Sequence, residues 1–188
     1  GGIVASGQSG RGPVMTVTAA ERGDTQAMGV VSRVILASPD RVWATLGNGW
    51  TYARWVVGTG EIRAVDVDFP APGARLHYRI GRWPLVKKGT TTVLACDEGQ
   101  LLELEAEGWP IGTAYVGFSL EPVVSGMSGS VGTDREPSGP HTATQVVITE
   151  HPKSGLASAL HNPAADQLFR LRNVETLRRL EKAVLGLP

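Results

Sequence analysis

Apolar side chains recur at every second position in one segment of this chain after another. The clearest examples are Leu102, Leu104 and Ala106 between Glu103, Glu105 and Glu107; Leu76, Tyr78 and Ile80 between Arg75, His77 and Arg79; and Val116, Phe118 and Leu120 between Tyr115, Gly117 and Ser119. Successive side chains of a strand point to opposite faces, so each segment is a strand with one buried and one solvated face. This pattern is typical of antiparallel sheets covered on one side.

Seven strands of this kind are expected, at residues 28–36, 60–67, 74–80, 86–96, 101–107, 113–121 and 142–150. Short turns such as 97–99 and 110–112 separate several of them. Connections this short join antiparallel neighbours, so the sequence predicts a meander.

Two short helices are expected between the first and second strands. Ser38 and Pro39 are the favoured pair at a helix start, and Gly47 ends the helix. A second short helix follows and contains Trp50, Tyr52 and Trp55.

A long helix closes the chain, with Asn162 as its cap, Pro163 as its first residue and Gly186 at its end. Its apolar residues recur at spacings of three and four, which predicts an amphipathic helix with a broad apolar face: Leu168, Leu171, Val174, Leu177, Leu180 and Val184. Strands in a run with helices set apart indicate an α+β fold. One straight helix cannot fill the concave side of a wide, twisted sheet, so we expect a cavity between them.

Composition excludes several classes of function. Lysine plus arginine and aspartate plus glutamate both number 18, so no net charge attracts nucleic acid. The single cysteine, Cys96, excludes an internal disulfide and a cysteine-based zinc site, and we expect it to be a small core residue. No apolar run spans a membrane and no secretory signal is recognisable, so a cytoplasmic location is expected.

No metal or other cofactor is expected either. The four histidines, His77, His141, His151 and His161, do not lie at helical ligand spacing from one another. His77 falls on the outward side of its strand with Arg75 and Arg79, either as a solvated basic face or as part of a partner-binding patch.

Two stretches rich in glycine and serine interrupt the pattern. Residues 1–27 are expected to be a flexible leader, part of which resembles sequence added for expression ahead of Met15 or Met28. Residues 124–141 are expected to be a flexible loop, or alternatively a lid, within a domain that spans 28–187.

The five tryptophans, Trp43, Trp50, Trp55, Trp83 and Trp109, are either core residues or the lining of a ligand entrance. For the cavity lining we select inward strand positions, three of the tryptophans in or beside the helices, one beside a turn, and positions on the terminal helix. These are Trp43, Trp50, Trp55, Tyr78, Leu102, Leu104, Trp109, Val116, Phe118, Val146, Ile148, Leu168, Leu171 and Arg172.

Glu150 and Tyr78 are the candidate catalytic residues. Glu150 shares a strand face with Val146 and Ile148, so it either lines the cavity rim or lies in water at the strand end. A carboxyl group near apolar walls has a raised pKa and can act as a general acid or base. Tyr78 is the best inward hydroxyl donor, and Arg172 can reach the rim. Glu61 and Arg63 also share a strand face, as a buried or an exposed pair.

Residues 28–186 resemble the START-like helix-grip superfamily (SRPBCC), and within it the bacterial polyketide cyclase/dehydrase-like proteins. The resemblance rests on VVSRVILASPDRVWATLGNGWTYARWVVG at 30–58, on ELEAEGWPIGTAYVGFSLEP at 103–122, on TQVVITEHPKSG at 144–155, and on the terminal helix at 162–184. It implies a seven-stranded antiparallel sheet wrapped around the C-terminal helix, with an apolar cavity for lipids, polyketides or quinones. The loop at 124–141 is longer than is usual for the superfamily.

Three functions follow as hypotheses, because fold alone does not give function. The first is binding of a small, largely apolar molecule. The second is a polyketide cyclase, aromatase or dehydratase that works by acid–base chemistry in the same cavity. The third is a regulatory or protein-interaction domain with a filled interior and an apolar patch outside. The oligomeric state stays open between monomer and homodimer.

Overall fold

The computed structural model describes residues 30–80, 87–108, 112–123, 143–154 and 163–188. Its elements are β1 (Val31–Ile35), α1 (Pro39–Leu46), the 3-10 turn η2 (Gly49–Thr51), α2 (Tyr52–Trp55), β2 (Ile62–Val65), β3 (Arg75–Ile80), β4 (Lys87–Asp97), β5 (Leu101–Gly108), β6 (Gly112–Val123), β7 (Ala143–Pro152) and α4 (Pro163–Leu185). The predicted order of elements is confirmed. The expected leader and the loop at 124–141 lie outside the described residues.

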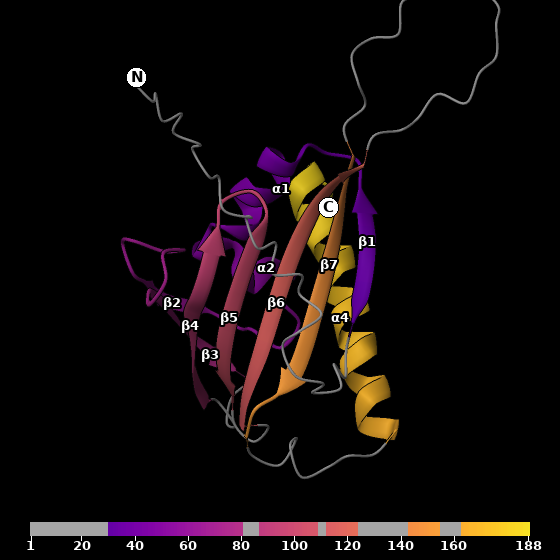
Figure 1. The fold of residues 1–188 in the computed structure, drawn as a ribbon. Coiled ribbons are helices and arrows are strands. Elements are labelled where there is room, and N and C mark those ends of the chain that lie inside the picture. The colour runs from indigo at the N-terminus through magenta and orange to yellow at the C-terminus, as the bar shows by residue number, and fades with distance from the viewer. Residues whose placement is uncertain (1–29, 81–86, 109–111, 124–142, 155–162) are drawn as a thin grey trace, which may run out of the picture.

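The seven strands form one antiparallel sheet in the order β1-β7-β6-β5-β4-β3-β2. Strands β2 to β7 follow one another as the predicted meander, whereas β1 pairs with β7 at the far edge. Helix α4 lies behind the sheet in Figure 1, next to β1 and β7, and α1 and α2 cover one end. The α+β helix-grip arrangement predicted from the sequence is therefore confirmed.

The short helices start and pack as their sequence dictates. The hydroxyl of Ser38 accepts a hydrogen bond from the backbone N–H of Arg41, and Pro39 occupies the first turn. The Tyr52 hydroxyl donates to the carbonyl of Leu46 at 2.8 Å, which ties α2 to the end of α1. These contacts fix the start of α1 and join α2 to its end.

The core lies where α1, α2 and the C-terminal half of α4 meet the sheet. Trp55 is fully buried, and its ring packs edge-on against Phe118 with the centroids 5.8 Å apart. On α4 the buried apolar residues include Leu177, Leu180 and Val184. At the sheet edge, Arg33 Nε donates to Glu181 Oε2 at 2.7 Å and joins β1 to α4.

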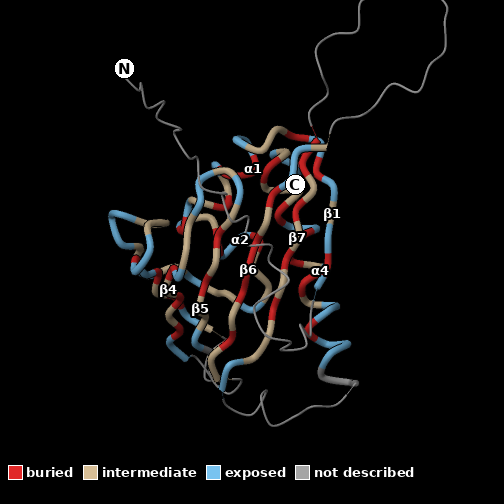
Figure 2. Tube along the Cα trace, in the orientation of Figure 1, coloured by how far each residue is buried: buried red, intermediate tan, exposed pale blue. Residues whose placement is uncertain are grey.

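The N-terminal half of α4 differs from the sequence prediction. Leu168, Leu171 and Val174 are 69%, 57% and 47% exposed, and Figure 2 shows these turns largely in pale blue. A residue three positions further along a helix points ~300° around the axis, which is ~60° short of a full turn. Apolar residues spaced by three therefore shift by ~60° around the helix at each step. The apolar residues therefore follow a spiral. The buried face in this half holds Phe169, Asn173 and Thr176 instead.

Candidate functional site

A cavity of about 140 Å³, partly open to solvent, lies between the inner face of the sheet, the segment after α2, and α4. The segment contributes residues 56–59 and α4 contributes Arg172. The backbone N–H of Val57 donates to Thr176 Oγ1 at 3.3 Å, which ties the segment to α4 beside the cavity. The remaining wall comes from the inward positions of β3 to β7, together with Tyr52.

Small side chains on the inner face of the sheet leave the space open. Ala106 and Ala114 face each other in the register of β5 and β6, and both line the cavity. Gly89 is buried beside Tyr78 in the register of β3 and β4. A Cβ at Gly89 would lie 2.6 Å from Tyr78 Cε2, so the tyrosine ring lies directly on the glycine backbone.

The volume limits what the cavity accepts. Engineered apolar cavities of roughly 150 Å³ take up benzene, whereas pockets for drug-sized ligands measure roughly 300–1,000 Å³. At about 140 Å³ this cavity accommodates a single ring or the end of a chain.

Glu150 on β7 is the carboxylate on the cavity wall. It is 1% exposed, and Arg172 Nη2 of α4 donates to its Oε1 at 3.0 Å. Burial raises the pKa of Glu150 above its ordinary value, because the charged form loses its hydration. The Arg172 guanidinium and the Asn173 side chain lower the pKa, but burial outweighs them. Glu150 therefore lies inside the protein rather than in water at the strand end.

Tyr78 lines the wall contributed by β3. Its hydroxyl donates to the carbonyl of Glu107 at 3.3 Å and accepts from Thr91 Oγ1 at 3.5 Å. Burial raises the pKa of Tyr78, although Thr91 and Arg172 act in the opposite direction. The side chain is therefore a neutral phenol at physiological pH, with its hydrogen bonds already made within the sheet.

The cavity brings together part of the predicted set. The residues from that set on its wall are Tyr78, Leu104, Val116, Phe118, Ile148, Glu150 and Arg172. The common signal was inward alternation on neighbouring strands, together with one turn of α4.

Other predicted residues do not line the cavity. Trp43, Trp55, Leu102 and Val146 are buried core residues, because α1, α2 and the C-terminal half of α4 fill that end of the sheet. Trp50 is 59% exposed. Successive residues of a 3-10 turn differ by ~120° in direction, so burying Gly49 turns Trp50 outward. Leu168 and Leu171 are exposed for the reason given above, and Trp83 and Trp109 lie outside the described residues.

Sequence reasoning also missed part of the wall. Leu76, Ile80, Thr91, Ala106 and Ala114 line it, and strand alternation was the signal that could have found them. Residues 56–59 and Tyr52 had no such signal, since their place depends on how α2 packs.

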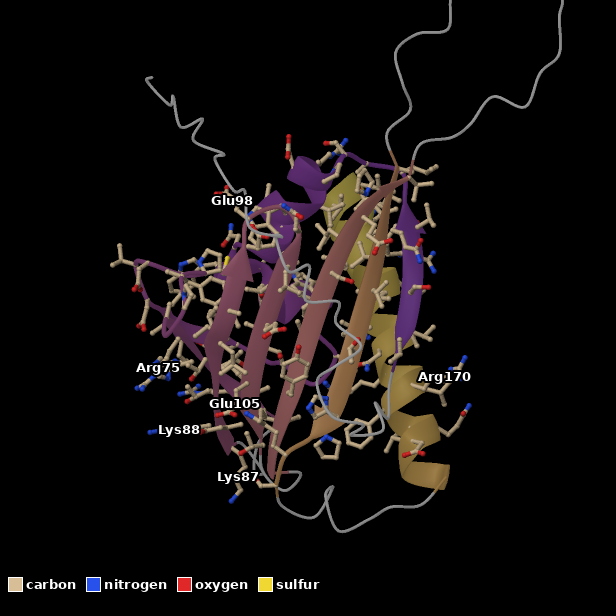
Figure 3. All side chains as sticks on the ribbon, viewed as in Figure 1. Arg75, Lys87, Lys88, Glu98, Glu105 and Arg170 are labelled. Atoms are coloured by element: carbon tan, nitrogen blue, oxygen red, sulfur yellow. The ribbon has the colours of Figure 1, made fainter. Side chains whose placement is uncertain are left out.

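The other candidate sites are surface features. Glu61 pairs with Arg63 at 3.1 Å, with both side chains more than half exposed, so this pair is the exposed alternative. Figure 3 shows the side chains of Arg75, Lys88 and Arg170 pointing away from the protein. His77 Nδ1 lies 3.3 Å from Thr90 Oγ1 in a half-buried position.

Cys96 is partly buried against the core. Within the described ranges, no group of three histidine, cysteine, aspartate or glutamate side chains is arranged to hold a metal ion. His141 and His161 lie outside those ranges. None of the helices described here is long and apolar enough to cross a membrane.

No protein-family model matches the sequence, and no curated protein is detectably similar to it. Solved structures do resemble it. A conserved protein from Geobacillus kaustophilus superposes with a TM-score of 0.57 at 12% identity, over 84% of this chain and 95% of its own. The helix-grip protein Ara h 8.0201 gives 0.53 at 13% identity, over 84% and 96% of the two chains.

A third similar structure is DynU16, a protein from the dynemicin biosynthetic locus. It gives a TM-score of 0.56 at 15% identity, over 85% of this chain and 48% of its own, so the present chain spans about half of DynU16. Identities this low establish architecture and no more. By its strand order, its gripped C-terminal helix and these likenesses, the chain has the helix-grip fold.

Proposed function

We propose that the protein binds a small, largely apolar molecule in the cavity between the sheet and α4. The observation that carries the proposal is the cavity itself, whose walls are mostly aliphatic and aromatic with a few polar groups. Such a lining is typical of small-molecule sites. The volume favours a ligand that inserts one ring or one chain end, so a longer lipid, polyketide or quinone would leave the rest of its length outside.

The cavity also favours this function over a domain that acts only through its surface. That alternative predicts a filled interior. Here small residues keep a space open beside Tyr78 and Glu150, at the expected cost of lost packing. The likeness to DynU16, from a biosynthetic locus, is compatible with a small-molecule role.

Titration with benzene, the size of ring that cavities of roughly 150 Å³ take up, followed by NMR of isotope-labelled protein, tests binding. We expect saturable shifts of the methyl groups of Ile80 and Ile148, which line the cavity. Ala106→Ile, which fills the cavity, should remove these shifts, whereas Ala64→Ile on the exposed face of β2 should keep them. Absence of saturable binding, or equal binding by both variants, would refute the proposal.

A second candidate is a cyclase or dehydratase that uses Glu150 as its general acid or base. The observation in its favour is the raised pKa of Glu150, caused by burial, on the wall of the same cavity. The chemistry would be an intramolecular aldol closure of a poly-β-ketone with loss of one water. Tyr78 would hold a substrate carbonyl by turning its single hydroxyl hydrogen from the carbonyl of Glu107 to the substrate.

A linear poly-β-keto thioester, assayed by mass spectrometry for the dehydrated ring, separates the two functions. If the protein is an enzyme, Glu150→Gln abolishes product while leaving binding of the thioester largely intact. If the protein only binds, the wild type forms product no faster than buffer.

A further inference from the structure

A groove that shares no lining residue with the cavity lies between η2 and the residues that follow β2. We infer that it binds a partner polypeptide through an arginine flanked by apolar side chains. The guanidinium lies between the indole of Trp50 and the carboxylate of Asp66. This is a second binding function, independent of the one proposed for the cavity.

The size of the groove suits a polypeptide segment. It is open to solvent and measures about 520 Å³, whereas sites for drug-sized ligands measure roughly 300–1,000 Å³. Residues 47–50 form one wall, and residues 65–67 with Phe69 form the other. The groove therefore has room for one long side chain and parts of its neighbours.

Two exposed apolar side chains line the groove. Trp50 is 59% exposed, and Val67 is fully exposed. Tryptophan is usually largely buried in folded proteins, and at protein interfaces it is among the residues that contribute most to the binding free energy. An exposed indole and an exposed valine in one groove therefore indicate a surface that a partner covers.

Local contacts fix both walls of the groove. The backbone of Gly49 lies directly on the opposite wall, since a Cβ there would be 2.9 Å from Val65 Cγ1 and 3.4 Å from Phe69 Cδ1. The N–H of Trp50 donates to Asn48 Oδ1 at 3.1 Å, which holds the turn that carries the indole. A partner therefore meets a preformed surface, and little free energy is lost in ordering it.

The charge of the groove is negative. Asp66 lies on its wall, and no basic side chain among the described residues lines it. Asp66 Oδ2 accepts from the N–H of Arg75 at 2.9 Å, and the N–H of Asp66 donates to the Arg75 carbonyl at 2.9 Å, so the carboxylate is held in place. The Arg75 side chain itself points away from the protein in Figure 3. Asp68 is exposed and adds a second negative charge nearby, so the groove complements a positively charged partner.

Arginine fits this arrangement better than lysine. A guanidinium is planar, so it can stack on the face of Trp50 while its N–H groups point in its own plane toward Asp66. An ammonium group is a more strongly hydrated point charge and cannot stack in this way. Apolar residues on either side of the arginine would contact Val67 and Phe69.

NMR titration of the full chain with the peptide acetyl-Gly-Leu-Arg-Leu-Gly-amide tests the inference. The readouts are the indole N–H signal of Trp50, assigned by its loss in Trp50→Phe, and the backbone N–H signal of Val67. We expect both signals to shift saturably. Replacing the arginine of the peptide by citrulline, a neutral group of the same shape, should weaken binding at least about fivefold, as for a cation–π contact combined with an exposed ion pair.

Two variants assign the binding to the groove. Asp66→Asn keeps the acceptor for the N–H of Arg75 but removes the charge, so it should weaken binding of the arginine peptide at least about threefold and leave that of the citrulline peptide unaltered. Trp50→Ala, followed at the Val67 signal, should weaken binding at least about fivefold. Asp166→Asn, the same change at an exposed position of α4, should have no effect. Both replaced groove residues are exposed, so the backbone spectra away from the groove should match those of the wild type and show that the variants are folded.

Three results would overturn the inference: no saturable shift, equal binding of the citrulline peptide, or unaltered binding by the Asp66 and Trp50 variants. Shifts of the same signals on dilution of the protein without peptide would overturn it as well, because they would show that a second copy of the chain covers the groove. The ligand of the cavity is tested separately by the benzene titration, so the two proposals can fail independently.

Discussion

Ala106→Ile is the most informative single change, because it tests the cavity through stability as well as binding. Ala106 lies on the cavity wall in β5, opposite Ala114. Isoleucine suits a strand and adds three carbon atoms. If the space beside Ala106 is empty, these atoms fill it without displacing the walls.

The expected gain follows from the size of the cavity. Filling all of the 140 Å³ would recover ~3.4 kcal/mol at ~24 cal/mol per Å³. Burying three carbons would contribute ~2.4 kcal/mol at ~0.8 kcal/mol each. The new isoleucine side chain does not fit the cavity fully in every rotamer, and folding must fix it in one rotamer. We therefore expect the free energy of unfolding to rise by about 1–2 kcal/mol.

Urea unfolding at equilibrium, followed by tryptophan fluorescence, measures this change. A rise of that size corresponds to a Tm increase of about 2–8 °C in a domain of this length. Ala64→Ile is the matched control, since the same atoms added at an exposed position of β2 should change the free energy by less than about 0.5 kcal/mol. A loss of about 1 kcal/mol or more in Ala106→Ile, with benzene binding retained, would refute the reasoning, because it would show that the interior beside Ala106 is already packed and that benzene binds elsewhere.

Three further predictions concern residues around the cavity and the core. Gly89→Ala should lower the free energy of unfolding by about 1–3 kcal/mol in urea, because its Cβ would lie 2.6 Å from the ring of Tyr78; an unchanged midpoint would contradict this contact. Burial raises the pKa of Glu150 in the folded state above its ordinary value of 4.5. The protonated form therefore contributes stability that is fully present at pH values below 4.5, and this contribution is lost as the pH rises through the higher pKa of the folded state. The urea midpoint of the wild type should therefore fall relative to that of Glu150→Gln between pH 4 and pH 8. A wild-type midpoint that rises relative to the variant over this range would show that Arg172 dominates the pKa of Glu150. Trp55→Ala should cost about 3–5 kcal/mol, whereas Trp50→Ala should cost less than about 0.5 kcal/mol, since Trp55 is fully buried and Trp50 is 59% exposed; similar costs for the two would argue against this placement of the helices.

The strands were predictable because their information is local. Alternation over six to twelve residues defines a strand and its inward face, as in Leu102, Leu104 and Ala106 of β5. The caps were predictable for the same reason, since Ser38 and Pro39 act on a backbone within three residues of themselves. Inward alternation left two places for Glu150, the cavity rim or water at the strand end, and only the structure shows it buried on β7.

Selecting the cavity wall from the inward residues was beyond such local rules. Leu102 and Leu104 share a face of the same strand, yet Leu104 lines the cavity and Leu102 belongs to the packed core. The difference depends on how far α1, α2 and α4 reach across the sheet. The exposed Leu168 and Leu171 show the same limit, because the angle at which a helix meets a sheet is set by all of its contacts at once.

By itself, the sequence determined the type and order of the described strands and of the helices α1, α2 and α4, since periodicity and capping act between residues close together in the chain. The tertiary structure alone decided that β1 pairs with β7, that Arg172 meets Glu150, and that the space beside Ala106 stays open. These features join residues distant in the chain, and they depend on where rigid elements stop packing against one another. No local sequence pattern encodes where that packing ends.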